Sequence, residues 1–318
     1  MTIDEFINQW NNSNDYIIAH TSGSTGKPKE INLPKSMVLK SAIRTNKFFD
    51  INNKSHIHLA LSPDYIAGKM IIIRAIISGA KLTYETPSNN LSFDGINSDI
   101  DLLAIVPSQL SDLLNRQLPF KIKNLIIGGS AIPSKLRDKL AYYNLNAYET
   151  YGMTETASHV ALRKVSEDST LPYFALPGIK FSIDKRECLV INIDNEYKFV
   201  TNDIVELIDD THFRIIGRYD NVIITGGLKV NPQEVENIIS KYLSDDINFF
   251  ISSRPDDKWG QEVILIIEKN SKINKSFLDN LKSELKNELK PYQLPKDFIL
   301  VDRIPLTSTG KLIRKYPI

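Results

Sequence analysis

The sequence predicts an α/β protein with a large N-terminal α/β domain of mixed sheets, an antiparallel β section, and a small C-terminal α+β domain. Three observations support this fold class. Short apolar segments alternate with helical segments up to about residue 150, which is typical of a sheet with helical crossovers. From about residue 160, strand-like segments follow one another without helices. Residues 218–318 then mix strand-like and helical segments, as a compact α+β unit would.

The first part of the chain supplies the alternating elements. Helices are expected at 1–14, 34–49, 65–78, 109–116 and 134–143. Strands are expected at 15–20, 56–61, 81–85, 102–106, 125–127 and 146–150. Ligands bind at the carboxyl ends of the strands in such sheets. We therefore expect the loops at 21–29, 128–133 and 151–156 to converge on one crevice.

The second part predicts a β section followed by the smaller domain. Strands are expected at 160–165, 179–183, 188–193, 197–200, 204–208 and 212–216. Beyond them we expect a hairpin at 222–230, helices at 232–242 and 275–289, and strands at 247–252, 262–268 and 298–301. The boundary is expected near 217–220, which gives domains over 1–217 and 218–318.

Composition narrows the classes of function. The net charge of +1 gives no argument for a nucleic-acid or membrane partner. Cys188 is the only cysteine, which excludes an intramolecular disulfide and a cysteine-based zinc site, and we expect it in the core. The N-terminus lacks an apolar leader, and the longest apolar run, 70–77, is interrupted by Arg74. These features predict a cytoplasmic protein.

The stretch from Thr21 to Lys29 is the most distinctive motif. It combines hydroxyls, glycines and lysines with almost no apolar surface. Glycine lets successive backbone N–H groups point inward and attract an anion, and lysine adds positive charge. The stretch departs from the common P-loop, because Thr21 stands where that pattern has its first glycine and Pro28 follows Lys27. Taken alone, this stretch can also be interpreted as a solvated linker and not as an anion-binding loop.

Four further stretches offer ligand-binding chemistry. In 151–156, Tyr151 offers a ring for stacking on a base and Glu155 a carboxylate for Mg²⁺, although the string alone can be an ordinary turn. Asp203, with Arg218 fifteen residues on, can bind ribose hydroxyls, but an isolated Asp between strands is more often a turn residue. Glycines 226–227 form a tight turn or let a thin ligand pass, and an exposed lysine such as Lys311 is usually only solubilising.

Together and in this order, the motifs resemble those of the adenylate-forming superfamily of acyl- and aryl-CoA ligases, carrier-protein adenylation domains and luciferases. The matching strings are 21–29, 128–131, 151–156, 201–203, 217–220 with 226–227, and 309–311. The resemblance implies an AMP-forming acid–thiol ligase that uses ATP, Mg²⁺ and CoA. It would form an acyl-adenylate with release of pyrophosphate and then a CoA thioester.

The resemblance also implies roles for the matched residues. The residues implied to bind ATP are Thr21, Ser22, Gly23, Ser24, Thr25, Gly26, Lys27, Gly128, Gly129, Ser130, Tyr151, Gly152, Asp203 and Arg218. Those implied for catalysis are Thr154 at the α-phosphate, Glu155 as the Mg²⁺ ligand, and Lys311 for adenylation. Asp220 is the implied hinge of a mobile C-terminal lid domain, and Gly226 and Gly227 are implied to line the CoA tunnel.

Within the superfamily the likeness is to the o-succinylbenzoate–CoA ligases of menaquinone synthesis. It rests on the strings 151–159 and 65–70 and on the short chain. Such a substrate carries one carboxylate to be activated and one to be recognised. The candidates for recognising the second are Lys69, Arg74 and His159, by charge and expected location. For Arg74, an ordinary position on an amphipathic helix is the alternative.

The chain departs from the superfamily pattern at its start. Only twenty residues precede the phosphate loop, so the resemblance implies that most of an N-terminal subdomain is missing. We expect a more open acyl pocket or a homodimer that covers the exposed face, with a monomer as the alternative. Two other functions remain open: loading of an amino or aryl acid onto a carrier protein, and nucleotide binding without catalysis.

Overall fold

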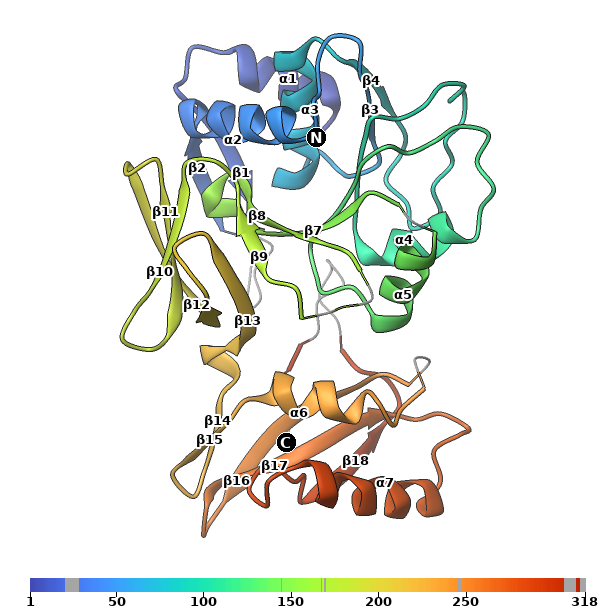
Figure 1. Cartoon of the computed structure of the whole chain (residues 1–318), viewed down its shortest axis with the longest axis vertical. Coiled ribbons are helices and arrows are strands. Elements are labelled where there is room, and N and C mark those ends of the chain that lie inside the picture. Colours follow the sequence, from blue (N-terminus) through green and yellow to red (C-terminus); the bar gives the residue numbers. More distant parts are fainter. Residues whose placement is uncertain are drawn as a thin grey trace. The chain divides into compact units, whose positions relative to one another are not determined.

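The computed structural model describes residues 1–20, 29–143, 145–166, 168, 170–244, 247–305 and 313–314 of the chain (Figure 1). The chain forms two compact units. The first comprises Met1–Phe181, Ile191–Phe199 and Ile208–Arg214. The second comprises Ser182–Val190, Val200–Leu207 and Ile215–Ile318, so it includes two short segments that precede the expected boundary at 217–220.

A mixed sheet of eleven strands dominates the fold, in the order β10-β11-β12-β13-β9-β8-β7-β6-β5-β3-β4. In this order, β7, β6, β5, β3 and β4 pair in parallel, whereas β7 with β8, β8 with β9, and β9 with β13 pair antiparallel. The parallel strands are β3 (His56–Leu59), β4 (Lys81–Tyr84), β5 (Leu102–Ile105), β6 (Leu125–Ile127) and β7 (Ala147–Met153). This arrangement confirms the predicted α/β fold with an antiparallel section.

The helices of the first unit form two groups (Figure 1). Helices α1 (Ile3–Asn11), α2 (Lys35–Phe48) and α3 (Ile66–Ser78) lie together, and α4 (Pro107–Leu114) lies beside α5 (Ser134–Tyr142). Helix α3 packs against β3 and β8, which explains its continuous apolar sequence from Met70 to Ile73. It ends at Gly79, whose φ of +68° gives the left-handed C-cap that glycine favours.

A hairpin near the N-terminus is the first departure from the predicted elements. Strand β1 (Tyr16–His20) pairs antiparallel with β2 (Glu30–Pro34), and His20 faces Glu30. The expected order of strand, loop and helix is therefore wrong, because a second strand precedes α2. Its signal in the sequence is weak, since Leu33 is the only fully buried residue of β2.

The β section also differs from its prediction. Strand β12 (Tyr197–Leu207) is continuous, so Thr201 to Asp203 lie within a strand and not in a turn. The strand tolerates Thr201 in the interior because its hydroxyl donates to the carbonyl of Leu189 at 2.9 Å. The other strands are β8 (Ser158–Lys164), β9 (Tyr173–Ala175), β10 (Ile179–Ile183), β11 (Cys188–Ile193) and β13 (His212–Arg218), of which β9 was not expected. Cys188 is buried and unpaired, as predicted.

The C-terminal part of the chain has the predicted α+β elements. A hairpin of β14 (Ile223–Thr225) and β15 (Leu228–Val230) precedes α6 (Pro232–Ile239). Strand β16 (Phe249–Asp256) is antiparallel to β17 (Gly260–Glu268), which is parallel to β18 (Asp297–Val301). Helix α7 (Lys275–Glu288) adds Leu281 and Leu285 to a core shared with α6 and the sheet.

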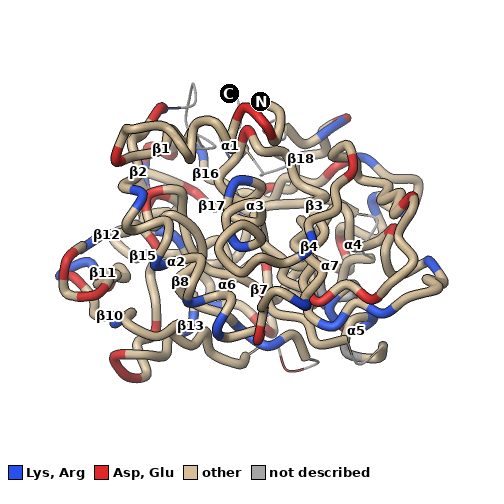
Figure 2. The backbone as a smooth tube through the Cα atoms, turned by 90° about the horizontal axis from the view of Figure 1, so that it is seen from above, with Lys and Arg blue, Asp and Glu red and all other residues tan. Residues whose placement is uncertain are grey.

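Basic and acidic residues are both spread over the backbone (Figure 2), although α2 carries four basic residues and no acidic one. This distribution agrees with the net charge of +1. Within the described ranges, no helix combines the length and apolar character needed to cross a membrane.

Candidate active site

The carboxyl ends of β5, β6 and β7 meet at one edge of the central sheet, because these strands are parallel and in register. Gly128 and Gly129 follow β6 directly. A Cβ on Gly128 would lie 2.5 Å from Oγ1 of Thr150, and one on Gly129 would lie 3.4 Å from Cγ1 of Val106. Gly129 also has a φ of +92°. Glycine is therefore needed where the end of β6 approaches β5 and β7. Most of the stretch at 21–29 lies outside the described residues, so the convergence of all three predicted loops stays a prediction.

Tyr151 and Gly152 belong to the end of β7. The Tyr151 ring packs edge-on against Phe213, with centroids 5.0 Å apart, and lies 5.8 Å from the ring of Tyr173. A Cβ on Gly152 would lie 2.3 Å from the carbonyl oxygen of Ser158 and 2.5 Å from Cα of His159. Glycine thus permits the close crossing of β7 and β8 at the bulge between Tyr151 and Gly152.

A single 3₁₀ turn, η1 (Thr154–Thr156), carries the next two candidates. The Thr156 hydroxyl is buried and accepts the Met153 N–H at 3.1 Å, which fixes the turn. Thr154 and Glu155 are only half-buried, so their hydroxyl and carboxylate are accessible. No cluster of three or more His, Cys, Asp or Glu suited to a metal exists among the described residues. Glu155 nevertheless fits Mg²⁺, which proteins commonly hold through one carboxylate together with substrate phosphates.

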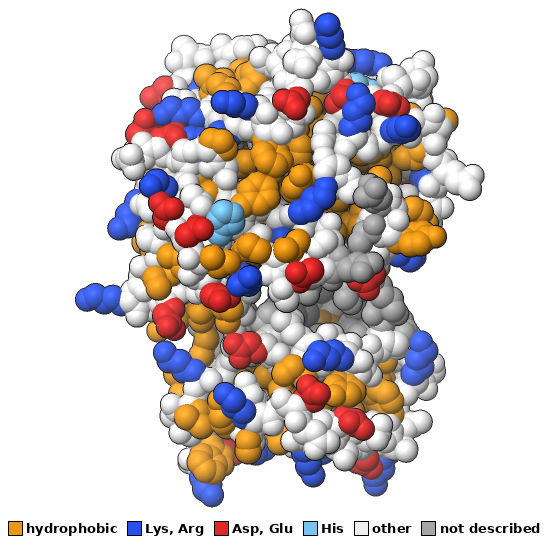
Figure 3. Space-filling model, viewed as in Figure 1, with side chains coloured by type: hydrophobic (Ala, Val, Ile, Leu, Met, Phe, Trp, Pro, Cys, Tyr) orange, Lys and Arg blue, Asp and Glu red, His pale blue; other side chains and the backbone are white. Residues whose placement is uncertain are grey.

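A buried polar cluster lies between α2, α3 and β8, beside the end of β7. Arg74 is 2% exposed, and its Nη2 donates to Oγ of Ser158 at 3.0 Å. Its Nε is buried without a partner among the described residues. Burial lowers the pKa of Arg74 to about 9, so the guanidinium remains charged at neutral pH. The face of the molecule over α3, β7 and β8 is rich in hydrophobic side chains (Figure 3).

His159 belongs to the same cluster. Its Nε2 lies 3.0 Å from Oγ1 of Thr45, and its Nδ1 lies 3.4 Å from Oγ of Ser158. Burial, with the charge of Arg74 as a second cause, holds the pKa of His159 well below its usual value. His159 is therefore neutral at physiological pH, and the positive charge of the cluster resides on Arg74.

Lys69 is also fully buried, but its described contacts lie elsewhere. Its Nζ donates to the carbonyl of Ile18 at 2.7 Å and lies 5.1 Å from the centroid of the Phe6 ring. Burial lowers the pKa of Lys69. These contacts tie α3 to β1 and α1.

The predicted ribose and hinge residues form a network within the second unit. Arg218 bridges two carboxylates: its Nη1 lies 3.1 Å from Asp203, and its Nη2 lies 2.9 Å from Asp220. Nδ2 of Asn202 donates to the other oxygen of Asp220 at 2.9 Å. The structure thus brings Asp203 and Arg218 side by side, as a shared ribose site requires.

Gly226 and Gly227 form the turn between β14 and β15, with φ values of +56° and +78°. A Cβ on Gly226 would lie 2.7 Å from Cε3 of Trp259, and the Gly226 N–H donates to the Trp259 carbonyl. Among the described residues, no atom lies within 4 Å of a Cβ built on Gly227. The backbone at Gly227 is therefore open to a thin ligand.

Ser130 follows Gly129 directly and is exposed. The other predicted site residues lie outside the described residues. They are Thr21, Ser22, Gly23, Ser24, Thr25, Gly26, Lys27 and Lys311.

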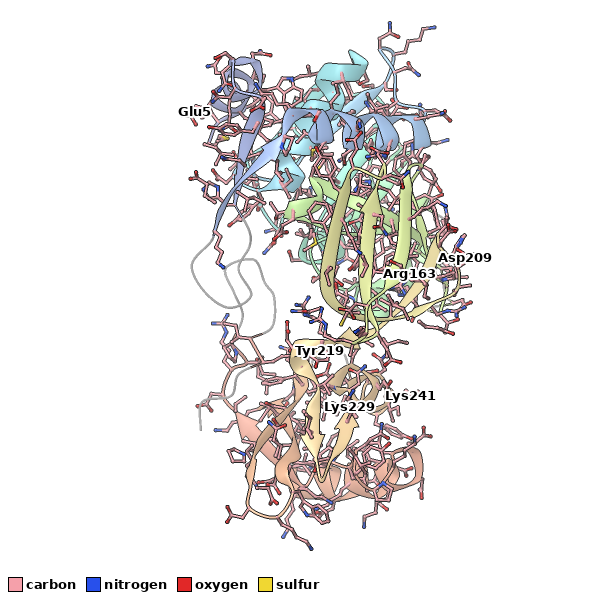
Figure 4. The ribbon with its side chains drawn as sticks, turned by 90° about the vertical axis from the view of Figure 1, so that its left-hand side faces the viewer. Glu5, Arg163, Asp209, Tyr219, Lys229 and Lys241 are labelled. Carbon is pink, nitrogen blue, oxygen red and sulfur yellow. The ribbon has the colours of Figure 1, made fainter. Side chains whose placement is uncertain are left out.

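A buried ion cluster next to Tyr151 was not anticipated from the sequence. Glu149 is 3% exposed and accepts hydrogen bonds from Arg137 on α5 and from Arg163 on β8. Figure 4 shows Arg163 on the β section. Glu149 stands two residues before Tyr151, so the two side chains share a face of the strand. This spacing was the available signal in the sequence that Glu149 lies beside the site. The partners could not be foreseen, because they come from separate elements.

The chain matches the AMP-binding enzymes over most of its length. The AMP-binding enzyme family profile matches residues 4–197, and the profile of the AMP-binding enzyme C-terminal domain matches residues 234–311. The protein therefore belongs to the AMP-binding enzyme family.

Relatives narrow the comparison. The 2-succinylbenzoate–CoA ligase of Staphylococcus epidermidis (strain ATCC 12228) is 28% identical over an alignment of 330 positions. The alignment covers 94% of this chain and 68% of that protein. The enzyme of the same name from Lactococcus lactis subsp. lactis is 26% identical over 324 residues, covering 94% and 70%.

Solved structures agree in fold. The acyl-CoA synthetase (AMP-forming)/AMP-acid ligase II-like protein of Dyadobacter fermentans is 31% identical with a TM-score of 0.62, and the match covers 97% of this chain and 90% of that one. The Bacillus subtilis o-succinylbenzoate CoA synthetase in complex with its acyl-adenylate intermediate has a TM-score of 0.76 at 20% identity, covering 94% and 68%. At that identity, the likeness concerns the fold alone.

Proposed function

We propose that the protein is an ATP-dependent acid–CoA ligase that converts o-succinylbenzoate to its CoA thioester, a reaction of menaquinone synthesis. Membership of the AMP-binding enzyme family supports the reaction type. The names of the curated relatives support the acid. The observation that carries the choice of acid is the buried charge of Arg74 beside the predicted nucleotide residues.

The reaction proceeds in two steps. In the first, a carboxylate oxygen of the acid attacks the α-phosphorus of ATP, the bond to the bridging oxygen of the β-phosphate breaks, and pyrophosphate leaves. In the second, the sulfur of CoA attacks the acyl carbon, the thiol proton is lost to solvent, and AMP leaves. The first step brings two anions together, so it needs donors and cations aimed at the α-phosphate.

The candidate residues divide this work. Thr154 donates to the α-phosphate, and Glu155 holds Mg²⁺, which neutralises phosphate charge when bound. Lys311 supplies positive charge for the first step only, and Gly227 lines the path of the thiol in the second. A lid over 218–318 that turns about Asp220 lets these two groups act in turn.

Arg74 supports recognition of an acid with two carboxylates. A buried cation is costly unless it is paired, and the described side-chain hydrogen bond of the Arg74 guanidinium goes to the neutral hydroxyl of Ser158. Its Nε is an unused donor in the same place. A carboxylate of the bound acid would satisfy both needs. Neutral His159 and Ser158 add hydrogen-bonding groups without adding charge.

The test compares two acids in wild type and Arg74→Met. Methionine fills the buried volume without charge. We expect kcat/KM for o-succinylbenzoate to fall about 10- to 100-fold, the worth of one charged hydrogen bond. The value for 4-oxo-4-phenylbutanoate, which keeps the oxobutanoate chain and lacks only the carboxylate on the ring, should change less than about threefold. Equal losses with both acids would contradict the assignment, and Arg44→Met serves as a control for removal of another arginine of the first unit.

The same assay separates the other enzyme class. A carrier-protein adenylation enzyme would release pyrophosphate with its acid yet form no free CoA thioester. A nucleotide-binding protein without catalysis would bind ATP and release no pyrophosphate with any acid.

A further inference from the structure

A row of side chains crosses four neighbouring strands next to Tyr151. Glu149 on β7 faces Arg163 on β8, and Phe213 on β13 faces Tyr173 on β9. The register of β8 and β9 pairs Leu162 with Phe174, so the next pair in this antiparallel ladder is Arg163 with Tyr173. The four side chains therefore form one cross-strand row, the arrangement through which side chains on one face of a sheet stabilise each other.

Electrostatic contacts fix one end of this row. Nε and Nη2 of Arg163 both donate to Oε2 of Glu149, the former at 3.0 Å. Arg137 donates to the same oxygen at 3.0 Å. Glu149 and Arg137 are 3% and 6% exposed, so little solvent competes for these bonds. The Arg163 guanidinium is thereby held in one orientation.

The fixed guanidinium in turn locates the Tyr173 ring. The central carbon of Arg163 lies 4.6 Å from the centroid of that ring, within the range of a cation–π contact. On the side away from Arg163, the Tyr173 ring stacks nearly parallel to the ring of Phe213. The two ring centroids are 5.4 Å apart and the ring planes make an angle of 16°. Tyr173 is 4% exposed and has no room to turn away.

Tyr151 rests on this platform. Two residues after Glu149, it projects from the same face of β7. The residue opposite it on β8 is Ala161, which is fully buried and leaves space for the ring. The Tyr151 ring occupies that space against Phe213 and Tyr173.

We propose that Arg163 and Tyr173 are positioning residues for nucleotide binding, because the Glu149–Arg163–Tyr173 row fixes the ring of Tyr151 that stacks on the adenine base. This inference rests on the proposed nucleotide role of Tyr151. Neither positioning residue needs to touch the nucleotide. The contact with the base is the same in ground and transition states, so loosening it raises KM for ATP and leaves kcat nearly unchanged.

The experiment measures AMP binding by calorimetry, which needs neither the acid nor CoA. Arg163→Lys keeps the positive charge beside Glu149 but loses the planar fork and the stacking face. Tyr173→Leu removes the ring. We expect each to weaken AMP binding about five- to tenfold, the worth of a stacking contact. Tyr173→Phe keeps the ring and should bind AMP within about twofold of wild type.

Matched controls separate positioning from general damage. Arg44→Lys alters another ion pair of the first unit, with Asp194, that has no described contact with Tyr151. It should leave AMP binding unchanged. In steady-state assays, KM for ATP should rise in Arg163→Lys while KM for CoA and kcat stay near the wild-type values. If Tyr173→Leu fails to fold, Arg163→Lys with its Arg44→Lys control decides the question.

The outcomes distinguish this inference from the proposed function. If wild type binds AMP and Arg163→Lys binds it equally well, the positioning role is wrong and the proposed function stands. If Arg163→Lys lowers kcat, all affinities and the melting temperature together, the row is only structural and the inference is overturned. If wild type itself does not bind AMP, both proposals fail.

Discussion

At the scale of single residues, Arg74 and His159 show how burial sets charge. The two side chains share Ser158 as a hydrogen-bonding neighbour, yet burial leaves the arginine charged and the histidine neutral. The difference follows from their usual pKa values. That of arginine lies so far above physiological pH that it remains above it after burial, whereas that of histidine, about 6.5, already lies below it and burial lowers it further. The cluster therefore presents one fixed positive charge.

The buried histidines predict how stability depends on pH. The pKa values of His56, His58 and His159 are all lowered by burial in the folded protein. Their contribution to stability is complete above the unfolded value of about 6.5 and is lost as the pH falls below it, because only the unfolded chain then takes up the protons. We expect the free energy of unfolding to decrease from pH 6.5 to 5.5, with each such histidine adding a slope of up to about 1.4 kcal/mol per pH unit.

Urea unfolding of His159→Gln across this range isolates one residue. The variant should show a shallower slope than wild type, by up to about 1.4 kcal/mol per pH unit. An unchanged slope in His159→Gln would contradict the buried, neutral state of His159.

At the scale of elements, the crossing of β7 and β8 carries the candidate catalytic turn. Gly152→Ala would place a methyl group 2.3 Å from the Ser158 carbonyl oxygen, so backbone must move. We expect a loss of about 2–3 kcal/mol of stability and a displaced η1 turn, seen as a lower melting temperature and weaker AMP binding.

Gly95→Ala is the matched control for Gly152→Ala. Gly95 has a φ of +74° and no atom within 4 Å of the added methyl group. Alanine there should cost about 1–2 kcal/mol through backbone strain alone and leave AMP binding intact. Wild-type stability in Gly152→Ala would show that the two strands separate easily at this point.

Elements with a strong local pattern could be predicted from the sequence. The apolar run of α3 with Gly79 after it, and the glycine turn of the β14–β15 hairpin, have signals that lie within a few residues. Strand β2 could not be predicted, because its pairing with β1 comes from a partner across the loop. Likewise, the polar Thr201 to Asp203 suggested a turn, and only the neighbouring β11 carbonyl that accepts the Thr201 hydroxyl explains why the strand continues.

The residues of the candidate site also differ in whether their signal lies within their own segment or depends on a neighbouring element. Arg74 could be named as a candidate because a charge in an apolar helix is conspicuous within its own segment. Glu149 and Arg163 were missed, because their pairing depends on the register of β7 and β8. Local chemistry is visible in a sequence, whereas support from a neighbouring strand requires the three-dimensional structure.

At the scale of the whole molecule, we propose that one chain performs both the adenylation and the thioester step. The ribose candidates Asp203 and Arg218 and the hinge candidate Asp220 are joined by hydrogen bonds, so nucleotide binding and the proposed rotation of the lid share one network. Lys311 is assigned to the first step alone. Lys311→Ala should therefore abolish most pyrophosphate release but still make thioester from a supplied acyl-adenylate.

The most direct test measures pyrophosphate release from ATP and Mg²⁺ with o-succinylbenzoate and with a panel of other carboxylic acids, each with and without CoA. We expect release with o-succinylbenzoate, turnover that continues only when CoA is present, and o-succinylbenzoyl-CoA as the product. Release with a different acid alone would contradict the substrate and keep the mechanism. No release with any acid, from protein that still binds ATP, would contradict the proposed enzyme activity.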